Sequence, residues 1–495
     1  MTGRTLLQFF HWYYPDGGKL WSEVADKASS LSDMGITDVW LPPAYKGASG
    51  ASSVGYDTYD LFDLGEYDQK GSIPTKYGDR KALAHAATSL RDAGIGVIHD
   101  VVFNHKMGAD EKERVQVRRA NPEDRNEIED HIFEASAYTR FTFPARQGQH
   151  SQFVWDAKCF SGVDHIEDPD DDGIFRLVNE YGEGEWNAEV DEENGNFDYL
   201  MGSDVEFRNN AVYEELKYWG RWLPEQVACT GFRLDAAKHI PAWFFRDWVG
   251  HMRDAVDSEL FVVAEYWHPD LEALRHYLEL VDQQLMLFDV ALNHRFYDAS
   301  KSGSDFDLRT IFDGTLVAAL PDKAVTLVGN HDTQPLQAME ASVETCFKPL
   351  AYALILMREQ GVPCVFYPDL YGASYSDSVN DGEKHDVDMP SIKCLPKLIE
   401  ARKRFANGAQ TDVFDDPHCI AFVRHGIAEA PGCIIILTNS EETSKRIELG
   451  PDHAGMTYTD FLGHCEEEIV ADQEGRISVR VNGGSVSVWV LKDSL

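Results

Sequence analysis

The chain has 495 residues, with 84 Asp or Glu against 45 Lys or Arg, and a formal net charge of −39. This acidity argues against nucleic acid or an anionic membrane as a partner, because both attract basic surfaces. Hydrophobic residues make up 43% of the chain, enough for a large core, and no apolar run approaches the roughly 20 residues of a membrane span.

The N-terminus and the cysteines both indicate a cytoplasmic protein. The first residues, MTGRTLLQFFHWYY, lead directly into a strand-like segment and lack the hydrophobic core and cleavage site of a signal peptide. The eight cysteines are scattered without a CxxC pair, and several lie in apolar runs, as Cys364 does in VPCVFY. We therefore expect reduced cysteines that pack in the interior.

Eight short apolar runs, each followed by a segment with helical spacing, extend over most of the chain. These runs cover residues 5–13, 36–43, 95–105, 231–239, 260–267, 286–292, 324–333 and 362–372. In WSEVADKASSLSDMG (21–35), for example, apolar residues recur at the spacing of an amphipathic helix. Eight strand–helix units predict an α/β fold, a parallel (β/α)8 TIM barrel. A doubly wound open sheet is the structural alternative.

Two segments depart from this alternation. About a hundred residues after His105 are rich in Asp, Glu, Asn, Gly and aromatic residues, which predicts a domain inserted after the third strand. From about residue 400 apolar residues alternate with period two, and Gly483–Gly484 is a hairpin signal, so we expect a C-terminal antiparallel β-sandwich. The predicted division is a barrel (1–104 and 209–399), an inserted domain (105–208) and a C-terminal β domain (400–495).

Charged residues gather where four of the predicted strands end. In GFRLDAAKH (231–239), Arg233 and Asp235 lie on the face of the predicted strand opposite to Phe232 and Leu234. Buried charges are costly unless they are paired or used, so the two residues form either a structural ion pair or part of a functional site. The other three strands end in Asp100, Asn104 and His105; in Glu265, Tyr266 and Trp267; and in Asn330, His331 and Asp332. Barrel enzymes carry their chemistry at this end of the strands, so four such clusters favour an active site.

The residue types in these clusters suit glycoside hydrolysis. That reaction needs one carboxyl group as an acid and another that is ionised, whereas the chain has no Gly-rich phosphate loop and no His-rich zinc set. We expect Asp235 to have the lower pKa, because the neighbouring Arg233 favours its charged form. Burial and nearby carboxylates are expected to raise the pKa of Glu265, which suits the acid.

Four motifs, in chain order, resemble the signature regions of the α-amylase family, glycoside hydrolase family 13. They are DVVFNH, GFRLDAAKH, VVAEYW and LVGNHDT, and GITDVWLPPAYKG and GVPCVFYPDLYG resemble the flanking regions. The resemblance covers the whole chain, and its details are most similar to the bacterial liquefying type. It implies endo-acting, retaining hydrolysis of α-1,4-glucosidic bonds in starch, glycogen or maltodextrins.

The resemblance also implies a role for each motif residue. Asp235 matches the nucleophile, Glu265 the general acid/base and Asp332 the third carboxylate, and the first two carboxyl groups are then expected roughly 5–5.5 Å apart. Asp100 matches a structural carboxylate. The residues that match substrate-binding positions are Tyr56, His105, Arg233, Lys238, His239, Trp267 and His331.

A calcium ion between the barrel and the inserted domain is a further implication of the resemblance. Its ligands would be the side chains of Asn104, Asp198 and Asp204 and the backbone carbonyl of His239. Oxygen ligands of this kind suit Ca²⁺.

The match weakens at the additional metal cluster of the liquefying type. Asn187 stands where a carboxylate is expected, and Glu206 and Arg208 stand where two aspartates are expected. An arginine there argues against a second cation, and Asp164 alone would not hold one. The segment DPDDDG (168–173) begins like an EF-hand loop but lacks its glutamate, so we interpret it as a solvated acidic loop.

Aromatic residues of the inserted segment are either sugar-stacking platforms or local core, and core is the expectation for most of them. They are Trp155, Phe160, Tyr181 and Trp186.

Two other functions compete with hydrolysis. A 4-α-glucanotransferase would use the same covalent intermediate with a sugar acceptor. A non-catalytic carbohydrate-binding protein is disfavoured because Asp235, Glu265 and Asp332 are all present. We expect a monomer that binds an α-glucan and neither nucleic acid nor membrane.

Overall fold

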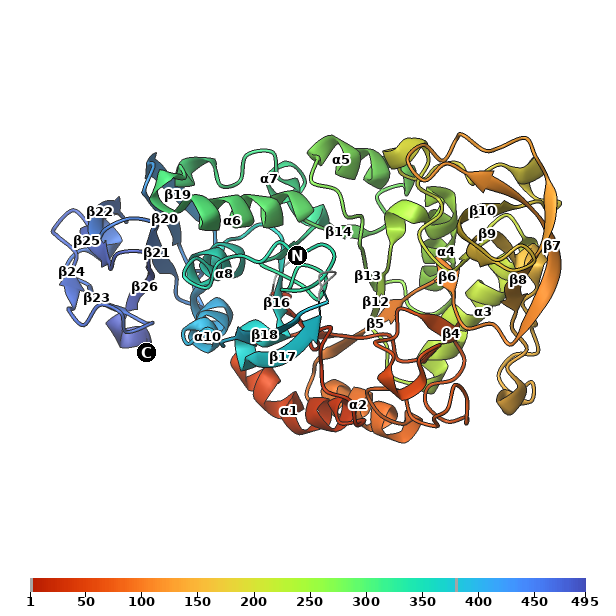
Figure 1. The fold of residues 1–495 in the computed structure, drawn as a ribbon. Coiled ribbons are helices and arrows are strands. Elements are labelled where there is room, and N and C mark those ends of the chain that lie inside the picture. The colour runs from red at the N-terminus through yellow and green to blue at the C-terminus, as the bar shows by residue number, and fades with distance from the viewer. Residues whose placement is uncertain (1–2, 379–381) are drawn as a thin grey trace.

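Eight parallel strands close into a barrel at the centre of the molecule (Figure 1). The computed structural model describes residues 3–378 and 382–495. The barrel strands are β1 (Leu6–Gln8), β2 (Asp38–Leu41), β5 (Gly96–Val101), β12 (Gly231–Leu234), β13 (Phe261–Ala264), β14 (Met286–Phe288), β15 (Ala324–Leu327) and β16 (Val362–Phe366). Because β1 pairs with both β2 and β16, the sheet has no edge. The predicted barrel is confirmed and the open-sheet alternative is wrong.

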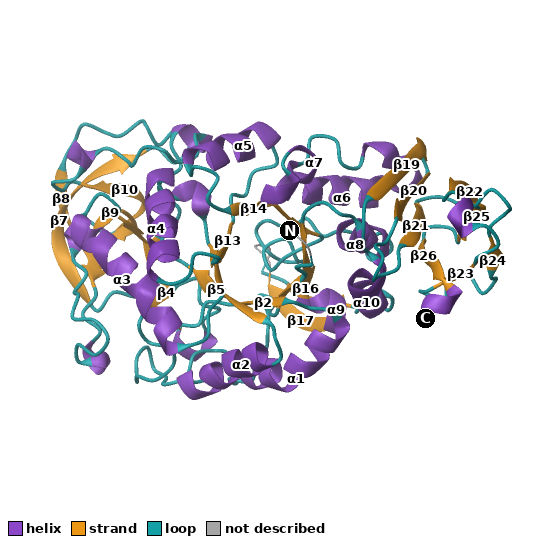
Figure 2. Ribbon diagram, turned by 180° about the vertical axis from the view of Figure 1, so that it is seen from behind, coloured by secondary structure: helices purple, strands orange, loops and turns teal. Residues whose placement is uncertain are grey.

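Helices surround the barrel strands, which explains the continuous apolar runs (Figure 2). They are α1 (Leu20–Met34), α2 (Arg80–Asp92), α3 (Asn210–Gln226), α4 (Ala242–Ala255), α5 (Leu271–Leu280), α6 (Val290–Ser302), α7 (Leu316–Ala319), α8 (Lys348–Met357), α9 (Tyr367–Tyr371) and α10 (Leu395–Phe405). Helix α1 ends at Gly35, whose positive φ of 120° turns the chain into β2. In the described part of the chain, no helix is long and apolar enough to cross a bilayer.

The segment that follows β5 forms a separate six-stranded sheet at the right of Figure 1. In chain order its strands are β6 (His105–Lys106), β7 (Glu111–Ala120), β8 (Phe133–Arg140), β9 (Phe160–Ile166), β10 (Asp171–Leu177) and β11 (Ser203–Val205). Trp155, Phe160 and Trp186 are buried, as expected for core residues, whereas Tyr181 is half-buried. Residues 168–170, in the acidic loop between β9 and β10, are exposed.

Two short two-stranded sheets accompany the barrel. They are β3 (Lys46–Gly47) with β4 (Thr58–Asp60), and β17 (Ala373–Ser378) with β18 (Lys384–Met389).

The C-terminal strands form two antiparallel sheets that pack on each other. The six-stranded sheet contains β19 (Gln410–Asp416), β20 (Cys419–Arg424), β21 (Cys433–Thr438), β26 (Val486–Leu491), β23 (Thr457–Asp460) and β24 (Ile469–Val470). The second sheet pairs β22 (Thr443–Glu448) with β25 (Arg476–Val481). Ile436, Val479 and Trp489 belong to the core that the two sheets share.

The hairpin predicted at Gly483–Gly484 is wrong. This turn does connect β25 to β26, but the two strands pair in different sheets, so the chain crosses from one sheet to the other there. The expected boundary at residue 400 falls inside α10, and the first C-terminal strand begins at Gln410.

All eight cysteines are free thiols. Cys159, Cys364, Cys419 and Cys433 are buried, which matches the expectation of reduced packing residues, whereas Cys346 is exposed.

The register of three neighbouring strands sets up the candidate site. Arg233 on β12 is the direct partner of Asp100 on β5 and of Val263 on β13. Glu265 immediately follows β13, two residues beyond Val263, so its side chain lies on the same side of the sheet as that of Val263, toward the C-terminal end of the barrel.

The buried His99 of β5 makes the stability of the barrel depend on pH. Its Nε2 lies 2.9 Å from the carbonyl oxygen of Ala228, and burial lowers its pKa to about 4. Because the unfolded chain takes up a proton at higher pH than the folded chain, this stability is complete above the unfolded pKa of about 6.5 and is lost as pH falls toward 4. At about pH 5 the loss is about 2 kcal/mol relative to neutral pH.

Substitution of His99 by glutamine should remove this loss, since an amide can keep the hydrogen bond without titrating. Thermal unfolding of both proteins at neutral pH and near pH 5 measures the effect, with His418→Gln at an exposed position as the control. Equal acid sensitivity of H99Q and the unchanged protein would contradict the assignment.

Candidate active site

One buried arginine joins three carboxylates at the C-terminal end of the barrel. Arg233 Nη1 donates to Asp100 Oδ1 (2.9 Å) and to Asp235 Oδ1 (2.6 Å), and its Nη2 donates to Glu265 Oε2 (2.5 Å). The Arg233 side chain is completely buried. A buried cation with three carboxylate partners fixes their relative positions, because leaving any of them unpaired would be costly.

Asp100 acts within this network as an internal support. Its second oxygen accepts hydrogen bonds from Trp40 Nε1 and from the Tyr56 hydroxyl, both at 2.9 Å. Burial raises the pKa of Asp100, and Arg233 opposes that shift. The carboxylate is fully enclosed, which is consistent with the structural role implied by the resemblance.

The pKa expected for Asp235 is wrong. Burial raises the pKa of this carboxyl group well above its usual range, and Arg233 lowers it by less than burial raises it. Burial, followed by the charge of Glu265, likewise raises the pKa of Asp332 to about 8. A cluster with more carboxyl groups than cations therefore favours retaining a proton.

An aromatic wall stands beside the carboxylates. The rings of Tyr56 and His331 are stacked with centroids 4.9 Å apart, and the Trp12 ring lies 5.8 Å from Tyr56 at an angle of 3°. His105 Nε2 lies 2.8 Å from the backbone oxygen of Tyr56, and Gln8 Nε2 lies 3.1 Å from His331 Nδ1. The structure therefore brings together the predicted residues Tyr56, His105 and His331.

Trp12 and Gln8 are members of this wall that the sequence analysis did not single out. The available signal was their place in the first apolar run, LLQFFHWYY, which ends at the same face of the barrel as the recognised motifs. Trp12 is half-buried, so part of its ring is accessible.

Lys238 and His239, two of the residues that match substrate-binding positions, contact the inserted segment. Lys238 Nζ pairs with Glu193 Oε2 at 2.6 Å and lies 3.5 Å from the backbone oxygen of Trp267. His239 is buried, with Nδ1 2.8 Å from the carbonyl oxygen of Phe197. Their side chains therefore link the barrel to residues 191–198, and Trp267 is half-buried beside them.

Asp191 is a further residue that the sequence analysis missed. Its carboxylate accepts a hydrogen bond from the Tyr266 hydroxyl, and its backbone N–H donates to the Lys238 oxygen at 2.9 Å. The inserted segment is thereby tied to the residues that adjoin Glu265.

Three of the predicted metal ligands, Asn104, Asp198 and Asp204, are buried. Asn104 Nδ2 lies 3.3 Å from Asp204 Oδ1, and the buried Oδ1 of Asn104 has no hydrogen-bond partner. Asp198 accepts from Asn187, and burial raises the pKa of Asp198 to about 6 and that of Asp204 well above its usual range. Within residues 3–378 and 382–495 no group of three His, Cys, Asp or Glu side chains is placed to hold a metal, so a metal here would also need amide or backbone oxygens as ligands.

Two arginines pair with Glu206, a position that the resemblance assigns to the additional metal cluster. Arg208 donates to both oxygens of Glu206 at 2.7 Å, and the completely buried Arg176 lies 3.4 Å from the same carboxylate. Glu206 is therefore already paired with cations. Arg176 was not foreseen, because β10 gives no sign in the sequence of where its side chains point.

A parallel barrel with clustered carboxyl groups at its C-terminal end is an arrangement that suits an enzyme of the glycosidase class. Comparison with known proteins agrees: residues 16–393 match the family "Alpha amylase, catalytic domain". The chain belongs to the alpha-amylase family, and it is a glycoside hydrolase that acts on α-1,4 bonds of glucans.

Several relatives are similar along their full length. The chain is 58% identical to the cytoplasmic alpha-amylase of Escherichia coli K12, with 100% of each chain covered. It is 43% identical to an alpha-amylase of Geobacillus stearothermophilus over 98% of this chain and 86% of that protein. A solved alpha-amylase of Geobacillus thermoleovorans in complex with acarbose has the same fold, with a TM-score of 0.63, 16% identity and coverage of 99% and 97%.

Lysine in place of Arg233 should keep the charge but lose the fork that holds Asp235 and Glu265 together. We expect kcat/KM on soluble starch to fall at least about 100-fold, since small misplacements of reacting groups have effects of this size. The matched control is Arg146→Lys, which alters another buried arginine, one paired with Asp60 at 3.0 Å. A similar loss of activity in both variants would mean that the effect is one of folding.

Proposed function

We propose that this protein is an endo-acting, retaining α-amylase in which Asp235 forms a covalent glycosyl-enzyme intermediate. The observation that carries the proposal is the sharing of the Arg233 guanidinium between Asp235 and Glu265 on neighbouring strand ends. A shared guanidinium keeps the two carboxyl groups close, which favours the short separation of retaining enzymes, roughly 5–5.5 Å, over the wider spacing of inverting ones.

The roles follow from the chemistry of retention. Glu265 protonates the glycosidic oxygen while Asp235 attacks the anomeric carbon, and water deprotonated by Glu265 then releases the sugar. Arg233 orients the nucleophile and favours its charged form. Asp332, which lies 3.3 Å from His331 Nε2, is placed beside the aromatic wall to bind sugar hydroxyls and stabilise the transition state.

The excess of carboxyl groups over cations supports the assignment of one carboxyl group as the acid and another as the nucleophile. Asp100, Asp235 and Glu265 pair with one arginine, and Asp332 adds a fourth carboxyl group, so the cluster favours keeping a proton. The general-acid role that we propose for Glu265 requires this residue to carry the proton when substrate binds.

The aromatic wall supports a sugar substrate. Half-buried Trp12 and Tyr56 present ring faces of the kind on which glucose units stack. The names of the similar proteins, which include a maltohexaosidase of a Bacillus strain at 44% identity, support starch, glycogen or maltodextrins as the substrate class.

We further propose that Asn104, Asp198, Asp204 and the backbone carbonyl of His239 hold a calcium ion. The donor set is all oxygen, and the unpartnered Oδ1 of Asn104 fits such a ligand. When bound, the ion would neutralise two buried carboxylates and tie the insertion to the barrel. A cytoplasmic location is proposed from the name of the Escherichia coli relative, and the monomeric state stays a prediction.

Proton NMR of fresh products from a maltooligosaccharide blocked at its non-reducing end tests the function. Short blocked fragments that appear first as α-anomers are expected for endo-acting, retaining hydrolysis. Initial β-anomers would refute retention, and longer products without new reducing ends would indicate a 4-α-glucanotransferase.

Asparagine in place of Asp235 should lower kcat by about 10⁴-fold, a loss typical of removing a catalytic carboxylate that acts in a unit. Binding of maltoheptaose, measured by calorimetry, should change little. The control is Asp377→Asn, which makes the same chemical change on β17. Near-normal turnover of D235N would refute the assignment of the nucleophile.

Calcium should raise the thermal unfolding midpoint of the chelator-treated protein. At a hundredfold excess over Kd the stabilisation is about 2.7 kcal/mol. Asp204→Asn should abolish both this increment and the metal found by elemental analysis. Asp164→Asn should preserve them, because Asp164 accepts from the Gly202 N–H at 2.8 Å and lies outside the proposed ligand set. Retention of one calcium ion per chain by D204N would contradict the proposed ligand set.

A further inference from the structure

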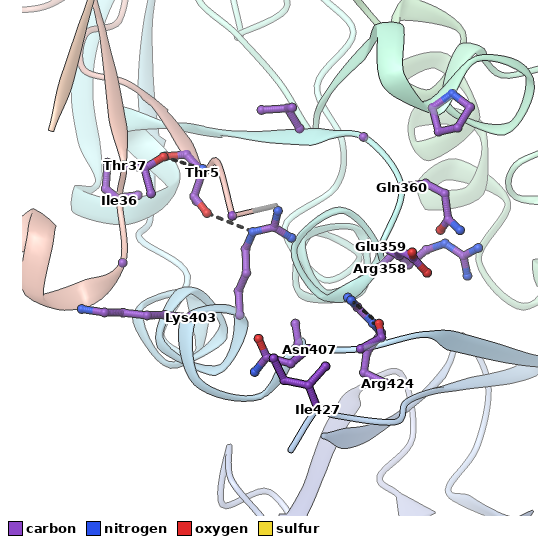
Figure 3. A pocket seen from close by; sticks show the side chains of 18 of the residues that line it. Thr5, Ile36, Thr37, Arg358, Glu359, Gln360, Lys403, Asn407, Arg424 and Ile427 are labelled. Atoms are coloured by element: carbon purple, nitrogen blue, oxygen red, sulfur yellow. Dashed lines mark hydrogen bonds between the residues drawn. The ribbon is translucent and has the colours of Figure 1, made fainter. Parts of the chain in front are cut away.

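A large cavity lies at the opposite end of the barrel from the carboxylates (Figure 3). Its volume is about 1010 Å³, and its lining includes Thr5, Thr37 and Val362 at the N-terminal ends of β1, β2 and β16. Residues of α10 and of β20 complete the lining, so the cavity sits between the barrel and the C-terminal sheets. It is therefore separate from the active site.

Two arginines of this lining bind the end of helix α8. Arg402 Nη1 donates to the Leu356 oxygen, and Arg424 Nη1 donates to the next carbonyl, that of Met357, at 3.0 Å. Further contacts fix each side chain: Arg402 Nε to Thr5 Oγ1 (2.9 Å), and Arg424 Nη2 to the Gly408 oxygen (2.9 Å). The two guanidinium groups are neighbours, because each binds one of two consecutive carbonyl groups at the end of α8.

The carbonyls fix these arginines but do not neutralise them. Among the described residues neither guanidinium has a carboxylate within ion-pair distance, although acidic residues outnumber basic ones by 84 to 45 in the chain. In the same cavity Arg358 does have a partner, since both its terminal nitrogens lie 2.9 Å from Asp412. Burial and the charge of Arg424 lower the pKa of Arg402 to about 10, and Arg424 is only 6% exposed.

Both guanidinium groups also keep unused donors. Each has five N–H groups, and carbonyl or hydroxyl oxygens of the described residues accept from three of them. The remaining N–H groups are on the terminal nitrogens. A helix C-terminus contributes only a partial negative charge, so it offsets little of the two formal charges.

We propose that this cavity binds a small anion that carries a phosphate group, held by Arg402 and Arg424. Paired guanidinium forks match the oxygens of a phosphate, and such charge-assisted bonds are the strong ones. The cavity is larger than inorganic phosphate requires, so a phosphate ester with a small organic group also fits. Glu359 and Asp322 line the same cavity, and their charges disfavour a polyanion.

Calorimetric titration of the full chain with inorganic phosphate at constant ionic strength, against chloride, tests the proposal. We expect saturable binding to the unchanged protein and a Kd at least tenfold higher for Arg424→Gln, which keeps an amide for the Met357 carbonyl but loses the charge. Arg358→Gln is the control and should stay within twofold, because Asp412 already neutralises Arg358. No saturable binding, or equal weakening by both substitutions, would overturn the proposal.

A second measurement does not depend on the folding of any variant. Phosphate should slow the modification of Arg402 and Arg424 by phenylglyoxal in the unchanged protein, as followed by peptide mass spectrometry. Equal rates in phosphate and chloride would overturn the site. Repeating the titration with a hexose monophosphate distinguishes a phosphate ester from inorganic phosphate as the ligand. Tighter binding of the ester identifies an organic phosphate, and tighter binding of inorganic phosphate identifies the free ion.

Discussion

The catalytic face of this protein depends on one buried guanidinium. Arg233 holds Asp100, Asp235 and Glu265, and it also lies against the rings of Trp40 and Tyr56, 5.0 and 5.7 Å from their centroids. A cation at this point makes it possible to bury several carboxylates together, and its contact with aromatic faces adds to the attraction. The positions of Glu265, Asp235 and Tyr56 are therefore not independent of one another.

The inserted segment completes the site as well as covering it. Asp191 contacts Tyr266, which adjoins Glu265 in the chain, and Glu193 contacts Lys238, which lies three residues after Asp235. Asp204 of the same segment contacts Asn104, which follows β5 of the barrel. Buried positive charge from Arg176 lies beside this acidic group, so the insertion carries part of its own charge compensation.

The sequence predicted the barrel and the clustered motifs because both are local patterns. Apolar runs, helical spacing and polar residues at strand ends can be recognised without knowing which distant segments meet. Trp12, Asp191 and Arg176 were missed because their importance arises from packing against residues far away in the chain. The raised pKa of Asp235 was missed for a related reason, since the extent of burial outweighs the neighbouring arginine. The turn at Gly483–Gly484 shows that a hairpin signal does not decide which sheet the next strand joins.

The closure of the barrel has a consequence for the order in which the enzyme is made. The seam between β1 and β16 joins Leu6 to Cys364, and Gln8 meets His331 across a separation of 323 residues. Contacts of such long range form only after the intervening chain is available. A nascent chain that has just exposed Asp235 and Glu265 on the ribosome still lacks Asp332 and the last barrel strand. Catalytic competence is therefore acquired late in synthesis, when β16 joins the N-terminal strand.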